Sequence, residues 1–413
     1  MSKPIVKKPE LLIPASSPEV FKTALYYGAD AIYIGGESFG LRAGSKNFSH
    51  DEMKAAVDMA HEKGVKVYVT ANIFAHNDDL EAAEEYFATM VDIKPDALLV
   101  SDPGLFMAAR KACPEVPIHI STQANNTNYG TFNFWYEHGV RRLVCARELS
   151  LAEIKKIRAN IPEDCEIEAF VHGAMCISYS GRCLLSAYMT GREANHGECA
   201  HPCRWKYAVV EQTRPGQYMD VDETDRGTYI FNSSDLAMIG HIDDMVDAGI
   251  DSFKIEGRMK TALYVAVMAR AYRNAIDLYF EDPDEYRRQI PRFEREIRSC
   301  TYREYCTGFF YGKPGTESQI YGANTYQKGY TYLGNVEEIT SEGYIKTSQY
   351  NKFSVGDAIE IVHPDGTDEK RTIGRIFDMD GTSVESAPHP RQEVYIDLGD
   401  NEASVGMVLR REE

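Results

Sequence analysis

The sequence predicts an α/β protein whose main part is a TIM-type (β/α)8 barrel. Eight short apolar runs fall within the first 260 residues, and amphipathic helix patterns separate most of them. The runs are apolar along their whole length, which is typical of parallel strands covered on both faces. They begin at Glu10, Ala31, Val65, Ala97, Pro117, Arg141, Glu166 and Ser252.

Helix start and stop signals support the same pattern. Ser17 provides an N-cap and Gly28 ends the helix that follows, while Ser49 and Glu52 form a capping box for a helix that stops at Gly64. An open doubly wound sheet is the alternative arrangement. No G-x-G-x-x-G motif follows the first strand, which weakens the dinucleotide-binding form of that alternative.

The regular spacing breaks between the seventh and eighth strands, where about 75 residues intervene and include a cysteine-rich insertion. Residues 262–300 have the pattern of one or two long helices. From about Tyr330 the pattern changes to short alternating strands with turn signals. We therefore expect two domains: a barrel with a cysteine-rich segment (168–212) and a helical extension (262–300) over residues 1–325, and a small all-β barrel or sandwich over residues 326–413.

The net charge is −18 and the pI is near 5.1, which argues against a protein that coats nucleic acid by bulk charge. Residues 176–206 reverse this balance locally, with four cations against two carboxylates. The N-terminus lacks the apolar core of a signal peptide, and no apolar run approaches the length of a membrane span. We therefore expect a soluble, cytoplasmic protein with no membrane partner.

Four of the nine cysteines lie within 28 positions, in the spacing C-x6-C-x15-C-x3-C: Cys176, Cys183, Cys199 and Cys203. Cytosolic thiols are kept reduced, and thiolates are preferred ligands of soft metals. The spacing favours an iron–sulfur cluster, because only the last pair has the short spacing of a zinc knuckle. Tetrahedral zinc and unligated thiols are the alternatives. The other five cysteines are expected to be ordinary buried thiols.

The working residues of a barrel lie at the C-terminal ends of its strands. These positions and the cysteine segment offer guanidinium groups suited to carboxylate or phosphate. The candidate substrate-binding residues are Arg42, Gln123, Arg147, Arg182 and Arg258, and the candidate catalytic residues are His172 and Glu168. Each arginine can instead form structural ion pairs with neighbouring glutamates, and His172 can be a buried barrel histidine.

Motifs of the commoner hydrolases are absent. The chain contains no H-E-x-x-H, G-x-S-x-G or G-x-x-x-x-G-K-[ST]. A cysteine protease stays an alternative without a specific signal, because nine cysteines and eleven histidines offer many pairings.

Five stretches resemble the collagenase-like peptidase family. They are EAFVHGAMCISYSGRCLLS from Glu168 to Ser186, GREANHGECAHPCR from Gly191 to Arg204, PELLIPAS near the start, ISTQANNTN at 120–128 and FKIEGRMK at 253–260. Together with the C-terminal β region, the resemblance covers essentially the whole chain. By length and architecture the chain is similar to the tRNA-hydroxylation branch of that family.

The resemblance implies a four-cysteine iron–sulfur cluster, of the 4Fe-4S type, held by the four clustered cysteines. It also implies oxygen-independent, prephenate-dependent hydroxylation that yields 5-hydroxyuridine at the wobble position of tRNA. Prephenate is a dicarboxylate, so arginines at the barrel mouth are its expected partners. Unpaired anticodon bases would stack on aromatic residues such as Trp205 and Tyr207. The expected partners are thus tRNA, a small dicarboxylate, and a second copy of the chain or a related paralogue.

Three alternatives stay open at this point. The substrate of hydroxylation can be ribosomal RNA or a quinone precursor instead of tRNA. The family name implies a peptidase. In the third alternative, the protein is a non-catalytic binding protein whose metal site only holds the fold.

Overall fold

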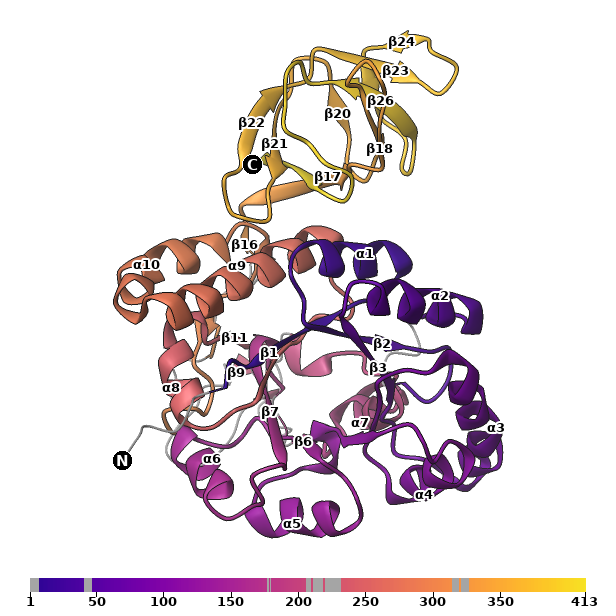
Figure 1. Cartoon of the computed structure of the whole chain (residues 1–413), viewed down its shortest axis with the longest axis vertical. Helices are drawn as coiled ribbons and strands as arrows, with labels where there is room; N and C mark the ends of the chain where they lie inside the picture. The colour runs from indigo at the N-terminus through magenta and orange to yellow at the C-terminus, as the bar shows by residue number, and fades with distance from the viewer. Residues whose placement is uncertain are drawn as a thin grey trace.

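The computed structural model describes most of the chain. The described residues are 7–40, 47–176, 178, 180–205, 209–210, 218–219, 232–313, 319–320 and 327–413. Figure 1 shows a barrel inside a ring of helices, with the C-terminal strands above it on the side of α1 (Pro18–Tyr26) and α9 (Ala262–Glu281). One hydrophobic core fills the barrel and its helices, and a second fills the C-terminal strands.

All eight predicted barrel strands are present, which confirms the predicted fold class. Neighbours along the chain pair in parallel from β1 to β7, and β12 pairs in parallel with both β1 and β7, which closes the sheet. The strands are β1 (Glu10–Pro14), β2 (Ala31–Gly35), β3 (Lys66–Ala71), β4 (Ala97–Val100), β5 (Ile118–Ile120), β6 (Arg142–Val144), β7 (Glu166–Ala174) and β12 (Ser252–Ile255).

The helices around the barrel follow the capping signals of the sequence. The Ser17 hydroxyl accepts the Val20 N–H, and Ser49 and Glu52 form the predicted capping box. The chain turns after α1 at Gly28, whose φ of 94° lies in the region that favours glycine. The other helices of the ring are α2 (His50–His61), α3 (Asn77–Ile93), α4 (Pro103–Ala112), α5 (Tyr129–Glu137), α6 (Leu151–Arg158) and α8 (Ile242–Asp247).

A buried ion network joins the strands where the barrel closes. The Arg142 guanidinium of β6 donates to Glu10 of β1 at 2.5 Å and lies 3.6 Å from Glu168 of β7. The Lys254 ammonium of β12 donates to Glu168 at 2.7 Å, and the Tyr68 hydroxyl donates to Glu10 at 2.9 Å. Glu10 and Arg142 begin β1 and β6, and Glu168 and Lys254 are the third residues of β7 and β12. The network therefore extends from the end of the barrel opposite the mouth into its interior.

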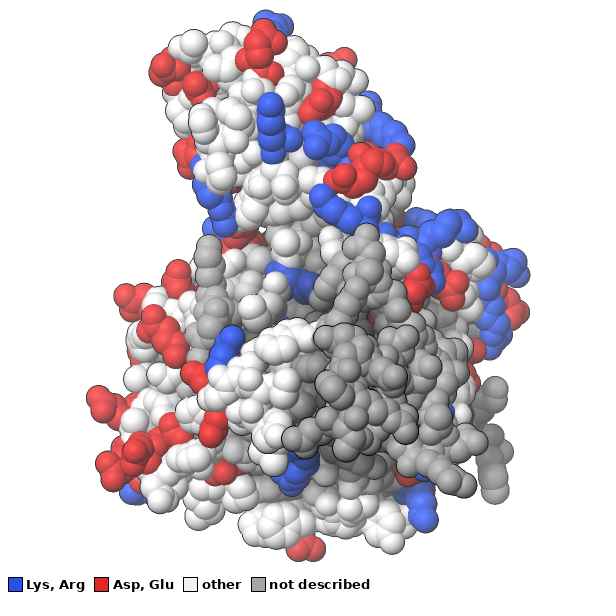
Figure 2. Space-filling model, turned by 180° about the vertical axis from the view of Figure 1, so that it is seen from behind, with Lys and Arg blue, Asp and Glu red and all other residues white. Residues whose placement is uncertain are grey.

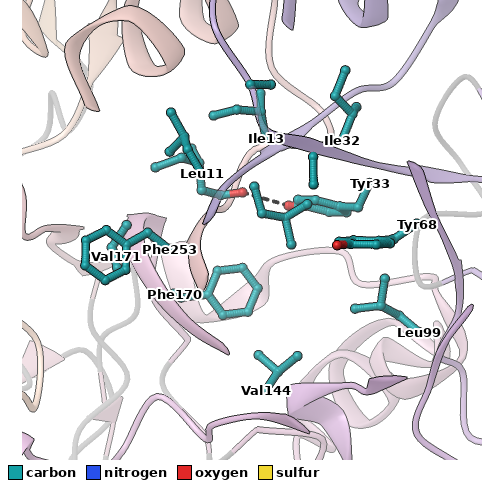
Figure 3. Packing of buried hydrophobic residues seen from close by; sticks show 14 of the residues in the cluster. Leu11, Ile13, Ile32, Tyr33, Tyr68, Leu99, Val144, Phe170, Val171 and Phe253 are labelled. Atoms are coloured by element: carbon teal, nitrogen blue, oxygen red, sulfur yellow. Dashed lines mark hydrogen bonds between the residues drawn. The ribbon is translucent and has the colours of Figure 1, made fainter. Parts of the chain in front are cut away.

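Apolar and aromatic side chains line both faces of the barrel wall. Figure 3 shows Tyr33 and Phe170 pointing toward the barrel axis, and Ile13 and Ile32 pointing toward the surrounding helices. The Lys254 ammonium lies 4.6 Å from the centroid of the Tyr33 ring and 5.4 Å from that of Phe170. The charged and aromatic layers of the interior thus contact each other through cation–π interactions.

Two short strands extend the barrel sheet beyond β7. Strand β11 (Asp235–Ala237) pairs antiparallel with residues 172–174 of β7, and β14 (Tyr305–Cys306) pairs parallel with β11. The Arg303 guanidinium fixes this edge by donating to buried Asp235 at 3.0 Å. The sequence did not predict these strands, because two or three residues are too short for a periodic pattern.

The helical extension and the C-terminal strands follow the predicted pattern. The extension is α9 and α10 (Pro283–Glu296), and α10 continues through Pro291. The described residues contain no helix with both the length and the apolar character needed to cross a membrane. The predicted domain division falls on residues outside the described ranges and stays a prediction.

The C-terminal strands form a four-stranded and a five-stranded antiparallel sheet, with one further pair. They are β17 (Tyr330–Asn335), β18 (Glu338–Ile339), β19 (Ile345–Ser348), β20 (Phe353–Ser354), β21 (Ala358–Val362), β22 (Glu369–Thr372), β23 (Arg375–Asp378), β24 (Ser383–Val384), β25 (Ser386–Ala387), β26 (Glu393–Asp397) and β27 (Val408–Glu412). Three more two-stranded pairings are β8 (Val209–Val210) with β9 (Tyr218–Met219), β10 (Asn232–Ser233) with β15 (Gln319–Ile320), and β13 (Thr301–Tyr302) with β16 (Gln327–Lys328).

Buried ion pairs join the C-terminal strands to the helical extension. Arg270 of α9 is 2% exposed and donates to Glu296 of α10 at 2.6 Å and to the Asp368 carboxylate. Arg410 of β27 donates to Asp368 at 2.8 Å and to Glu360 at 2.9 Å. The shared carboxylate of Asp368 thus lies between two buried guanidinium groups. The C-terminal strands are held to α9 by charge as well as by apolar contact.

We predict that Arg270→Ala destabilises the protein by about 3–5 kcal/mol, because it leaves the buried Glu296 carboxylate without this cation and removes one of the two guanidinium groups at Asp368. Urea unfolding followed by circular dichroism measures the change. Arg287→Ala on α10 is the matched control, because Arg287 is exposed and pairs with Asp284 at 2.9 Å. Its loss should leave the stability close to that of the wild type, because solvent screens an exposed ion pair. Equal effects of the two substitutions would contradict the role of the buried network.

Candidate functional site

The cysteine-rich segment follows the C-terminal end of β7. Cys176 is exposed, and Cys183, Cys199 and Cys203 are half-buried. The local elements are helix α7 (Leu185–Thr190) and the short 3-10 helices η2 (Ala194–His196) and η3 (Pro202–Arg204). The segment thus lies at the end of the barrel where the active sites of TIM-type enzymes are found.

Hydrogen bonds attach the cysteine-rich segment to the loop between β3 and α3. The Phe74 N–H donates to the Asn195 carbonyl at 3.1 Å, and the Asn195 side-chain amide donates to the Cys183 carbonyl at 3.0 Å. The His196 ring lies 3.1 Å from the Asp79 carboxylate of α3. These contacts fix the backbone around Cys183 relative to the barrel.

A second contact of the segment involves Gln123, which lies on the 3-10 helix η1 (Thr122–Ala124) after β5. Gly181 has a φ of 71°, and a Cβ atom there would lie 2.2 Å from the Gln123 carbonyl oxygen and 3.0 Å from the Phe74 ring. Only glycine fits this close approach. The structure thus places Gln123 beside the segment through its backbone, and its substrate-binding role stays a prediction.

Two of the clustered sulfurs accept N–H groups. The Arg147 guanidinium lies 3.7 Å from the Cys176 sulfur, and the His201 N–H donates to the Cys199 sulfur at 3.4 Å. Four accessible thiols with such donors suit a metal–thiolate site, since these contacts stabilise thiolates. In the described part of the chain, however, no three Cys, His, Asp or Glu side chains form a metal-binding group. The donor set fits an iron–sulfur cluster in its chemistry, and its assignment as the ligand set stays a prediction.

The other cysteines differ from these four. Burial raises the pKa of Cys113 and Cys165 to about 11 and that of Cys145 and Cys300 to about 12. Cys306 is half-buried. Since a metal ligand must be a thiolate, the four buried thiols are poor candidates, and the accessible thiols after β7 are the better ones.

Arg147 is a predicted substrate-binding residue whose side chain contacts one of the clustered cysteines. Its guanidinium donates to the Ala174 carbonyl at 2.6 Å and stacks over the Phe170 ring at 4.9 Å, besides its contact with Cys176. The side chain is half-buried. It therefore combines a fixed orientation with access from the mouth of the barrel.

The other predicted arginines lie in different surroundings. Arg258 is 6% exposed and donates to Thr70 at 2.9 Å and to Asn47 at 3.1 Å, so it joins the ends of the barrel strands internally. Arg182 is exposed and lies 5.7 Å from the centroid of the Phe74 ring. Arg42 lies outside the described residues. Substrate contact by these arginines stays a prediction.

Glu168 lies inside the barrel wall. It is fully buried and bound by Lys254, and burial lowers the pKa of Lys254 against the opposing charge of Glu168. This placement gives Glu168 a clear structural role in the closure network. A catalytic role for Glu168 stays a prediction.

His172 lies in a cage of three tyrosine rings. Its ring centroid is 5.2 Å from that of Tyr305, 5.6 Å from Tyr272 and 6.1 Å from Tyr264. Burial and the charge of Lys260 lower the pKa of His172 to about 3. The imidazole is therefore neutral at physiological pH. Its role as an acid or base stays a prediction, and the observed contacts show a packed histidine beneath the cysteine segment.

The molecular surface is divided by charge. Figure 2, seen from the side opposite to Figure 1, shows Asp and Glu over the flank that carries α3 and α4, and Lys and Arg where α10 approaches the C-terminal strands. Arg292 and Arg295 are exposed on α10. Helix α10 also carries four carboxylates, Asp284, Glu285, Glu294 and Glu296, so cations and anions are interspersed at this junction.

Sequence reasoning missed Phe74, His76 and His196. Phe74 and His76 follow β3 and meet the cysteine segment, and His196 lies within that segment. The rule that selects residues after barrel strands would have found Phe74 if it had been applied to the third strand. His196 carries no local signal, because its contact with Asp79 spans 117 positions of sequence.

The surroundings of His172 predict a pH-dependent stability. Between its native pKa of about 3 and the ordinary value of 6.5, only the unfolded chain binds the proton, so stability falls as the pH falls through this range. When the pH is lowered from 7 to 5, the free energy of unfolding should therefore fall by about 2 kcal/mol less in His172→Phe than in the wild type. Urea unfolding at both pH values measures this, with exposed His138→Phe as the control. Parallel pH dependences of wild type and His172→Phe would contradict it.

Comparison with known proteins finds related sequences over almost the whole chain. The family model described as "Peptidase family U32" matches residues 16–320, and the "Peptidase family U32 C-terminal domain" matches residues 328–410. The chain is 40% identical to the tRNA hydroxylation protein P1 of Bacillus subtilis, covering 95% of this chain and 93% of that protein. It is 36% identical to the tRNA hydroxylation protein P of Escherichia coli, covering 98% and 97%. It is 35% identical to the 23S rRNA 5-hydroxycytidine C2501 synthase of Escherichia coli, covering 66% and 40%. The chain therefore belongs to peptidase family U32.

Proposed function

We propose that this protein is an RNA-modifying enzyme that hydroxylates tRNA, with 5-hydroxyuridine at the wobble position as the product. The observation that carries the proposal is the 40% identity to a tRNA hydroxylation protein over nearly the full length of both chains. Exposed arginines such as Arg292 and Arg295 on α10 would be available for contacts with RNA phosphates.

The proposal includes a 4Fe-4S cluster held by Cys176, Cys183, Cys199 and Cys203. When bound, such a cluster supplies a redox centre whose potential depends on N–H contacts to its sulfurs. Arg147 would then orient Cys176 and balance the negative charge of the thiolates. The accessibility of these four thiols, compared with the buried cysteines elsewhere, supports this ligand set.

The proposal also includes a small dicarboxylate cosubstrate, prephenate. Arg147 offers a guanidinium that is held by the Ala174 carbonyl and is half-open to the barrel mouth. Planar guanidinium groups bind carboxylates through paired N–H donors. The neutral His172 would support this end of β7 by packing and leave the charge of the site to the arginine.

The wobble modification is tested by deleting the gene and analysing tRNA nucleosides by mass spectrometry. We expect 5-hydroxyuridine and its derivatives to disappear and to return with the wild-type gene, while Cys199→Ser fails to restore them. Unchanged nucleosides in a strain that lacks related paralogues would contradict the proposal. Loss of a hydroxylated ribosomal RNA base or of a quinone would assign the enzyme to one of those substrates instead.

The cluster is tested by anaerobic purification with iron and sulfide analysis. We expect iron and sulfide in the wild type and a loss of most of both in Cys199→Ser, because one of four thiolates is removed. Cys306→Ser is the matched control, since Cys306 is also half-buried but lies on β14. Zinc without iron, or equal iron in the two variants, would contradict the proposed ligand set.

Peptidase activity is the second candidate function, and the family description supports it. Gelatin cleavage by the purified protein, abolished by Cys183→Ser, would establish that activity.

A further inference from the structure

A pocket separates the cysteine-rich segment from the loop that follows β3. Its volume is about 390 Å3, within the ~300–1,000 Å3 range of small-ligand sites. Phe74 and His76 line it from the barrel side, and Arg182, Glu193 and His196 line it from the segment. The pocket is open to the surface and borders Cys183.

The walls of the pocket are suited to a flat heteroaromatic ring. The Arg182 guanidinium lies over the Phe74 ring, 5.7 Å from its centroid, and a planar ring can stack on this cation–π pair. The imidazoles of His76 and His196 lie 5.7 Å apart at 84°, and with Glu193 they add hydrogen-bonding groups. Stacking surfaces combined with a few polar groups are what proteins use to hold an unpaired base.

The charges around the pocket favour a base over a dicarboxylate. The His196 ring lies 3.1 Å from Asp79, and the His76 ring lies 3.8 Å from Glu193. Each imidazole thus has a carboxylate beside it, and Arg182 is the one arginine or lysine among the described residues that line the pocket. A ligand with two carboxylates would meet Glu193 in the pocket wall and Asp79 behind His196, and a neutral base avoids this repulsion.

The shape of the pocket depends on how the cysteine segment is held against the barrel. Gly181 allows the segment to approach the Phe74 ring and the Gln123 carbonyl closely, and the Phe74 N–H is bound to the Asn195 carbonyl. The Asn195 amide holds the Cys183 carbonyl in turn. A ligand in this pocket therefore lies against the backbone that positions one of the proposed cluster ligands.

We propose that this pocket receives a single unpaired base of the substrate RNA, which stacks on the cation–π pair of Arg182 and Phe74. The inference rests on the proposed function and identifies where the chain holds the base. Exposed side chains beside it extend the surface for the neighbouring nucleotides: Leu184 is 74% exposed and Tyr188 is 87% exposed. The exposed Tyr188 ring can stack a neighbouring base.

The test measures binding of a fluorescent anticodon stem-loop RNA by anisotropy, using the anaerobically purified full chain. One RNA carries uracil at the wobble position, and the other is abasic there. We expect the wild type to bind the uracil RNA about ten-fold more tightly, the effect of one stacked base. Arg182→Gln should lose most of this preference. Arg192→Gln should keep it, because Arg192 is an exposed arginine of the same segment that does not line the pocket.

Phe74→Leu provides a second variant, with its fold checked by circular dichroism, and should also lose the preference. If RNA binds but Arg182→Gln and Arg192→Gln behave alike, the pocket is not the base site, and the proposed function stands. If calorimetry shows that Arg182→Gln weakens prephenate binding and leaves the base preference unchanged, the pocket belongs to the dicarboxylate and the proposal is overturned. If the wild type binds neither RNA, the proposed function fails with it.

Discussion

The barrel depends on charges that it buries at the seam where it closes. Arg142 joins the sixth strand to Glu10 of the first and to Glu168 of the seventh, and Lys254 of the eighth strand shares Glu168. Such pairs are costly to desolvate and costlier to break, because removal of one partner leaves a bare charge in the interior. All four charges are therefore paired only when the four strands β1, β6, β7 and β12 are assembled. An alternative register of any of these strands would leave at least one charge without its partner.

This constraint also limits where chemistry can occur. The charged network and the rings of Tyr33, Tyr68 and Phe170 fill the barrel, so its interior offers no passage from one end to the other. Enzymes of this fold react at the C-terminal ends of their strands, and the cysteine-rich segment follows β7 at that end. Substrate binding and reaction are thus expected at this end of the barrel.

The sequence was a reliable guide where the physical signal is local. The eight strands and the two capped helices follow from apolar runs and from Ser, Glu and Gly at helix ends. The rule for strand ends found Arg147 but also selected Arg258, which is buried against Thr70 and Asn47, because the rule gives a position along the chain and no exposure. The pocket at Phe74 could not be predicted, because its two walls come from segments about 100 positions apart and meet only in the fold.

The pairing of β11 with the end of β7 has a consequence for the whole cysteine-rich excursion. The chain leaves the barrel at Ala174 and returns at Asp235, which is paired with that same residue. The excursion is therefore a long loop, here called the handle, whose two ends are both anchored at the end of β7. The strand pairing of β11 with β7 offsets the entropy cost of closing this loop. A break in the backbone within the handle would leave both new ends tethered to the barrel. Insertions and deletions there would likewise change the handle without moving the two points from which it starts and ends.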